Sequence, residues 1–202
     1  MGRRILLAGL LGGIAMFLWA SLAHMVLPLG QAGIKEIPNE SGVLSALNTA
    51  LRGNSGFYFY PATGTTSNPT SQQRSAAMQQ YQEKLATNPS GILIYHPPGA
   101  KVLTPGQVIT EFLTELVEAF LVVFLLVQTR LGSYWSPVGF VLLAGILAAI
   151  TTNISYWNWY GFPVSYTVAY VTTEAVAFLA MGLVVSAIVK SPALPERVAK
   201  AA

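Results

Sequence analysis

Three glutamates lie close together in the second of four long apolar stretches of the sequence. Glu111, Glu115 and Glu118 precede the uninterrupted apolar run at residues 119–127, which is too short to cross a bilayer unless the helix also contains them. At about 100° per residue, a helix holds their side chains within roughly 60° of one another. Close carboxylates in a medium of low dielectric cannot all be ionised. This helix face is therefore suited to bind protons or a cation.

The other apolar stretches add polar groups at a similar expected depth. His24 and Asn153 lie near the outer ends of the first and third stretches, and Glu174 lies in the outer half of the fourth. A rise of about 1.5 Å per residue puts the four glutamates roughly 5–15 Å below the outer membrane boundary. No lysine or arginine lies inside these stretches to neutralise them. The predicted proton- or cation-binding residues are Glu111, Glu115, Glu118, Glu174 and His24, supported by the polar side chains of Tyr170, Thr173, Thr114 and Asn153.

Three interpretations of these acidic residues stay open at this stage: binding of protons or a cation, binding of a ligand or a partner helix, and a structural role. A charge at the centre of a membrane helix costs about 2.5–3.5 kcal/mol on insertion scales, so intramembrane glutamates usually face a bundle interior and have a function. In the structural role, protonated glutamates form hydrogen bonds with Tyr170, Thr114 or Thr173. No cofactor other than a cation is predicted, and the sequence names no particular metal.

Long apolar stretches and few charges identify an integral membrane protein. Only 9% of the 202 residues are charged, compared with about 25% in soluble domains. Each apolar stretch is near the roughly 20 residues that cross a hydrocarbon core of about 30 Å. The predicted fold class is an α-helical integral membrane protein, a four-helix transmembrane bundle with a small α+β extracytoplasmic insertion between helices 1 and 2. The predicted transmembrane helices are residues 5–27, 107–129, 137–156 and 166–189.

Basic residues near the helix ends indicate the orientation. The pair Arg3–Arg4 precedes the first predicted helix, Arg130 follows the second, and the loop at residues 154–165 has no charged residue. Short cytoplasmic loops are enriched in lysine and arginine. Both termini are therefore expected in the cytoplasm, with residues 190–202 as a cytoplasmic tail and residues 28–106 outside it.

The N-terminal helix has an alternative interpretation. Residues 1–23 combine a basic start, an apolar stretch and small residues at the end, as in a cleaved secretory signal peptide. The apolar stretch exceeds the usual signal-peptide length, and Gly9 and Gly13 form a GxxxG pattern suited to close helix packing. An uncleaved membrane helix is the preferred interpretation.

The segment at residues 28–106 is more polar and alternates between two patterns. Apolar residues at helical spacing follow a capping sequence, and short aromatic or aliphatic runs are bounded by glycine and proline. Such a small α+β core is marginal on its own, so contact with the transmembrane helices or a partner is expected. The expected elements are a helix at 43–51, a strand at 56–60, a helix at 71–86 and a strand at 91–95.

Known catalytic and metal motifs do not fit the sequence. The chain has no cysteine and no aspartate, and only two histidines, so thiol chemistry is excluded and a catalytic triad is poorly supplied. A di-iron carboxylate bundle needs Glu-x-x-His motifs, whereas the segment at residues 115–118 has glutamate in the position of histidine. The scattered basic residues form no nucleic-acid-binding patch. The sequence thus favours a protein without enzymatic activity.

The N-terminal third has a set of recognisable motifs: Trp19, the segment His24–Gly30, the segment Ile37–Glu40 and the aromatic segment Gly56–Pro61. With these motifs, mainly in the first 60 residues, the chain resembles a group of small uncharacterised bacterial inner-membrane proteins with four predicted transmembrane helices. This resemblance implies a bacterial inner-membrane location, and it implies no activity, cofactor or functional residue.

Three hypotheses about function follow from these features. The leading one is a non-enzymatic accessory or interaction subunit whose carboxylate cluster binds protons or a cation. The first alternative is a small transporter or channel component that works as an oligomer. The second is a membrane enzyme that acts on lipid or quinone, with a glutamate as the proton-transfer group. The expected partners are the lipid bilayer and either another membrane protein or further copies of this chain.

Overall fold

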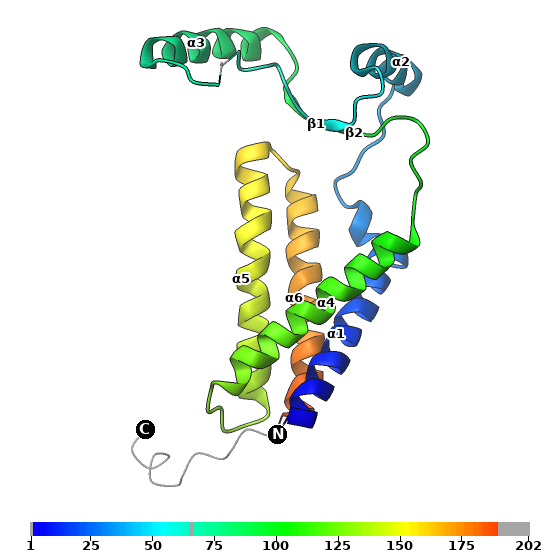
Figure 1. Cartoon of the computed structure of the whole chain (residues 1–202), viewed down its shortest axis with the longest axis vertical. Helices are drawn as coiled ribbons and strands as arrows, with labels where there is room; N and C mark the ends of the chain where they lie inside the picture. Colours follow the sequence, from blue (N-terminus) through cyan, green and yellow to red (C-terminus); the bar gives the residue numbers. More distant parts are fainter. Residues whose placement is uncertain (1, 65–66, 190–202) are drawn as a thin grey trace. The chain divides into compact units, whose positions relative to one another are not determined.

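The computed structural model describes residues 2–64 and 67–189, and these residues are mostly helical (Figure 1). They form two compact units, which we call the helical unit (residues 2–34 and 103–189) and the insert (Lys35–Val102). The predicted cytoplasmic tail at residues 190–202 lies outside the described residues.

Four long helices make up most of the helical unit. The helices α1 (Gly2–Met25), α5 (Trp135–Tyr160) and α6 (Val164–Ile188) are each long and apolar enough to cross a membrane. The helix α4 (Pro105–Val127) has a similar length, but it does not meet the same composition criterion for a membrane span because it carries three glutamates. A short 3-10 helix, η1 (Pro28–Gln31), follows α1. These features support a membrane location for the chain.

The helix α6 lies at the centre of the helical unit (Figure 1). It packs against α5 on one side and α1 on the other, while α4 packs on α1 and touches α5 only slightly. Two glycines of α1 allow α4 to approach closely. A Cβ atom at Gly13 would lie 2.9 Å from the Cα atom of Leu116, and one at Gly9 would overlap the ring of Phe120. The close packing predicted for the GxxxG pattern is confirmed.

Local hydrogen bonds fix where α4 begins and how α1 docks on α6. Thr104 Oγ1 accepts a hydrogen bond from the Gln107 backbone N–H at 3.3 Å, and Gln107 Oε1 accepts one from the Thr104 N–H at 2.8 Å. This capping box, followed by Pro105, sets the helix start and therefore the face on which the glutamates project. Across the unit, the Trp19 indole donates a 2.9 Å hydrogen bond to the Thr173 carbonyl oxygen.

The insert has the predicted order of helix, strand, helix and strand: α2 (Glu40–Leu51), β1 (Gly56–Tyr60), α3 (Ser71–Thr87) and β2 (Gly91–Tyr95). The strands pair antiparallel, with Gly56 opposite Tyr95 and Tyr60 opposite Gly91. Tyr95 is buried, and its hydroxyl donates a 3.2 Å hydrogen bond to Asn48 Oδ1 of α2. Neither α2 nor α3 has a buried residue, in agreement with the expected small core.

Candidate functional site

The four glutamates of the helical unit differ in how deeply they are buried. Glu111 is exposed and Glu118 and Glu174 are partly buried, whereas Glu115 is only 8% exposed. Their charges act on one another: Glu115 is repelled by the other three, and Glu118 by Glu111 and Glu174. The structure therefore brings together acidic residues of α4 and α6, two helices that are separated in the sequence by the whole of α5.

Glu115 lies at the contact between α4 and α1. Its backbone oxygen would be 3.2 Å from a Cβ atom at Gly13, so α1 covers this part of α4 closely. The Glu115 Oε2 atom is buried and has no hydrogen-bond partner. Leaving a buried polar atom unpaired costs about 1–3 kcal/mol, and more when it carries a charge. A proton or a cation at this carboxyl would remove that cost.

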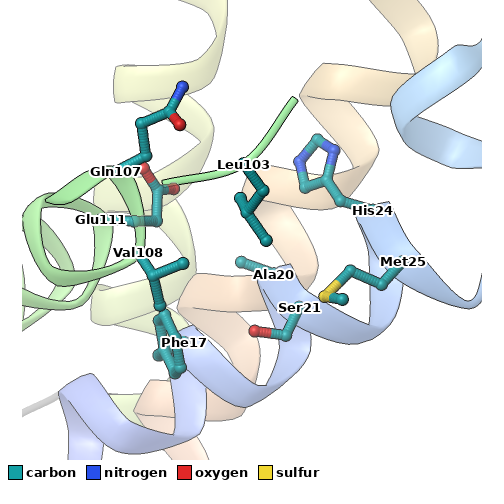
Figure 2. A pocket seen from close by; sticks show the side chains of 9 residues that line it. All are labelled: Phe17, Ala20, Ser21, His24, Met25, Leu103, Gln107, Val108 and Glu111. Carbon is teal, nitrogen blue, oxygen red and sulfur yellow. The ribbon is translucent and has the colours of Figure 1, made fainter. Parts of the chain in front are cut away.

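A cavity of about 430 Å³ lies between α1 and α4 (Figure 2), and we call it the α1–α4 cavity. Its lining is chiefly apolar. Figure 2 shows Gln107 and Glu111 together on α4, with His24 of α1 across the cavity from them. The lining residues are Phe17, Ala20, Ser21, His24, Met25, Leu103, Gln107, Val108 and Glu111.

A second cavity, of about 300 Å³, lies where α4 diverges from α5, and we call it the α4–α5–α6 cavity. The small α5 residues Ala148 and Ala149 line it on one side. The α6 residues that line it recur every four positions along one helix face, from Tyr166 to Phe178. The lining combines carboxylates, phenol rings and an amide. The lining residues are Glu118, Ala148, Ala149, Thr152, Asn153, Tyr156, Tyr166, Tyr170, Glu174 and Phe178.

A run of aromatic rings crosses the top of this second cavity and joins three helices. Tyr156 stacks on Phe162 at 5.3 Å between ring centroids, and Phe162 meets Tyr166 edge-on at 5.0 Å. Tyr166 stacks on Tyr170 at 4.3 Å, and Tyr170 lies 5.6 Å from the His24 ring of α1. The rings of Tyr156, Tyr166 and Tyr170 thereby line a cavity that also holds two carboxylates.

The residues predicted from the sequence separate into groups. Glu118, Glu174, Tyr170 and Asn153 line the α4–α5–α6 cavity, and Glu111 and His24 line the α1–α4 cavity, with Glu115 buried on the α1 side of α4. The two threonines do not bond to the glutamates. Thr114 Oγ1 donates to the Thr110 carbonyl oxygen and Thr173 Oγ1 to that of Ala169, both at 2.9 Å.

Two members of the cavity lining, Tyr156 and Tyr166, were not among the predicted site residues. The signal for Tyr166 was its place four residues before Tyr170 and eight before Glu174, on one helix face. Tyr156 lies three residues after Asn153 and so shares its face, although its aromatic neighbours at residues 157–160 also suit a membrane interface.

The surroundings of the four glutamates differ from those of a metal site and of an ion pair. Within residues 2–64 and 67–189, no group of three or more histidine, aspartate or glutamate side chains is placed to hold a metal. No lysine or arginine occurs at residues 5–34, 102–129 or 131–189 to neutralise the glutamates. These segments therefore supply no basic side chain as a counter-ion to the glutamates.

No protein-family model, curated protein or solved structure matched the chain. The function proposed below is inferred from the chain's own residues and their geometry.

Proposed function

We propose that this chain is a non-enzymatic bacterial inner-membrane protein with four transmembrane helices, whose carboxylate cluster binds protons or a cation in the outer half of the membrane. The observation that carries this proposal is the buried Glu115 carboxyl, which has an unpaired oxygen and lies among three further carboxylates. Binding of positive charge is the simplest way to make such a group compatible with burial.

The two faces of α4 support its assignment as the fourth transmembrane helix. Its 23 residues span about 35 Å at 1.5 Å per residue, enough to cross a hydrocarbon core. One face, with Glu115, Val122 and Leu126, is buried against the other helices. The opposite side exposes large apolar side chains that suit contact with lipid, namely Leu113, Val117, Leu121, Phe124 and Leu125.

The proposed orientation has both termini in the cytoplasm and the insert outside it. It is supported by the basic residues Arg3 and Arg4 in the first turn of α1 and Arg130 after α4, because these are the ends of the two helices that are not joined to the insert in sequence. Glu111 and Glu115 lie in the half of α4 that follows the insert in sequence, and Glu118 lies just past its middle. This orientation therefore puts these carboxylates between the outer boundary and the centre of the membrane. The bacterial inner membrane is proposed from the sequence resemblance.

An accessory or interaction subunit is the role we favour for such a protein. A cluster that takes up positive charge gives a membrane assembly a component that responds to protons or cations. A transporter component that works as an oligomer is the second candidate, favoured by the presence of a cavity on each side of α4 with acidic residues between them. Affinity purification in mild detergent tests the first role: it predicts a stoichiometric membrane-protein partner, and repeated recovery of an isolated monomer contradicts it.

The proposed binding of positive charge is tested by thermal unfolding of the detergent-solubilised chain at several pH values. If the folded state holds protons that are released on unfolding, its free energy of unfolding increases as the pH falls through the mildly acidic range. We expect this gain in the wild type and a smaller gain in Glu115→Gln and Glu118→Gln. Glu83→Gln, an exposed position in the insert, is the matched control. Equal pH responses in all four proteins, together with no response to added cations, would rule the proposal out.

A further inference from the structure

We propose that the α4–α5–α6 cavity is a binding site for a small organic ammonium cation. This inference rests on the proposed function, because it names the class of cation that one part of the carboxylate cluster binds. It is carried by the chemistry of the cavity lining.

The two carboxylates give the cavity its charge. Glu118 of α4 and Glu174 of α6 line it from different helices, and their charges repel each other. The buried and unpaired Glu115 carboxyl lies close enough to add its repulsion to both. A cation between Glu118 and Glu174 converts this repulsion into attraction.

Aromatic rings supply the second element of ammonium recognition. Tyr156, Tyr166 and Tyr170 line the same cavity. Tyr170, which stacks on Tyr166, lies about one helical turn before Glu174. The face of a phenol ring attracts an ammonium group, and the attraction is strongest when the contact is desolvated. Carboxylates combined with ring faces favour an alkylated ammonium, whose charge is spread over an apolar surface.

Asn153 adds a neutral acceptor to the cavity. Its side chain is 8% exposed, and its amide N–H donates a 3.0 Å hydrogen bond to the Ala149 carbonyl oxygen of its own helix. This bond uses a donor and leaves the Oδ1 acceptor available to an N–H group. The amide can therefore offer an acceptor to a cation in the cavity.

The size of the cavity and the arrangement of its potential metal-coordinating side chains restrict the class of ligand. A volume of about 300 Å³ is at the lower end of the range of small-molecule sites, about 300–1,000 Å³. The described residues offer no set of three carboxylate or histidine side chains arranged for a metal. A small amine with few carbon atoms fits both restrictions.

The test is isothermal titration calorimetry of the full chain in detergent or nanodiscs. The probes are ethylammonium and tetramethylammonium chloride, with sodium chloride at equal ionic strength and calcium chloride for comparison. We expect saturable binding of both ammonium probes and none of sodium or calcium. Glu118→Gln and Glu174→Gln should each weaken binding by about tenfold or more, because contacts with a charged group are among the stronger polar interactions. Tyr170→Leu should weaken tetramethylammonium binding about three- to tenfold through loss of a ring face.

Controls separate a failed site from a failed fold. Glu83→Gln in α3 should bind as the wild type does, and size-exclusion chromatography should give one profile for all variants. Absence of saturable binding of either ammonium probe, or wild-type affinity in both Glu118→Gln and Glu174→Gln, overturns the ammonium site. The pH response of thermal stability distinguishes the two proposals: if it persists in the wild type while ammonium binding is absent, proton binding stands and this inference fails alone. If both are absent, both proposals fail.

Discussion

The two cavities beside α4 share a wall and differ in chemistry. The α1–α4 cavity is larger and chiefly apolar, and its carboxylate, Glu111, is exposed. The α4–α5–α6 cavity is smaller and holds Glu118 and Glu174 among tyrosines. Since α4 supplies acidic residues to both, the difference comes from the opposite walls: apolar side chains of α1 on one side and the polar stripe of α6 on the other. Carboxylates of one helix thus have different surroundings, which are set by the helices that they face.

The largest expected loss of stability comes from truncating Phe178, a large side chain in the lining of the α4–α5–α6 cavity. Phe178 is buried and its side chain fills the space above Gly145 of α5. Phe178→Ala should reduce the free energy of unfolding by about 3 kcal/mol, the lower end of the range for buried phenylalanine, because lipid-embedded helices gain from packing without hydrophobic transfer. Phe17→Ala in the α1–α4 cavity, where the ring is only partly buried, should cost less. Denaturation in mixed micelles measures both, and equal losses would contradict the distinction between the cavities.

A smaller loss is expected where α1 packs on α4. A Cβ atom at Gly13 would meet the Leu116 Cα atom, which belongs to the backbone and cannot move aside cheaply. Gly13→Ala should therefore destabilise the protein by about 1–3 kcal/mol. Gly139→Ala is the matched control, because nothing lies within 4 Å of its Cβ position. A melting temperature lowered equally in both variants would show that the α1–α4 contact is not specific.

Loss of one hydrogen bond between α1 and α6 should have a moderate effect. Trp19→Phe removes the bond from the indole N–H to the Thr173 carbonyl oxygen, which should cost about 1 kcal/mol. Trp159→Phe, at a residue 78% exposed, serves as the control. Thermal unfolding in detergent that ranks the two variants in the opposite order would disprove the role given to this bond.

The smallest expected effect is at the exposed carboxylate of the first cavity. Glu111→Gln should change stability by no more than about 0.5 kcal/mol, as is usual for exposed positions. Glu118→Gln, at a partly buried position, should change the stability more and alter its pH dependence. Identical pH profiles for these two variants would remove the difference that we draw between the cavities.

The elements of the fold were largely predictable, because long apolar stretches and breakers mark helices directly. All four predicted long helices exist, and Thr104 and Pro105 correctly marked the start of α4. The third predicted helix ended four residues early at residue 156. Its aromatic end resembles an interfacial loop in sequence, whereas the helix continues to Tyr160 and stops before Gly161, whose φ is +70°. Whether α4 spans a membrane stays a prediction.

The acidic face was predictable from periodicity, and its division between two cavities was not. Helical spacing aligns Glu111, Glu115 and Glu118 on one face, and the same rule aligns Tyr166, Tyr170 and Glu174. Periodicity does not say which helices become neighbours. The GxxxG pattern predicts that α1 packs closely on another helix, but only the contacts of Gly9 and Gly13 identify that helix as α4.

The most direct test of the central claim is infrared spectroscopy of the purified chain at neutral pH. If the cluster binds protons, the wild type should show the carbonyl band of a protonated carboxyl group, and Glu115→Gln should reduce it while Glu83→Gln leaves it unchanged. Addition of ethylammonium should weaken the band as the cation replaces the proton. A spectrum with ionised carboxylates alone, unaffected by ammonium or metal cations, would contradict the claim that this cluster binds positive charge.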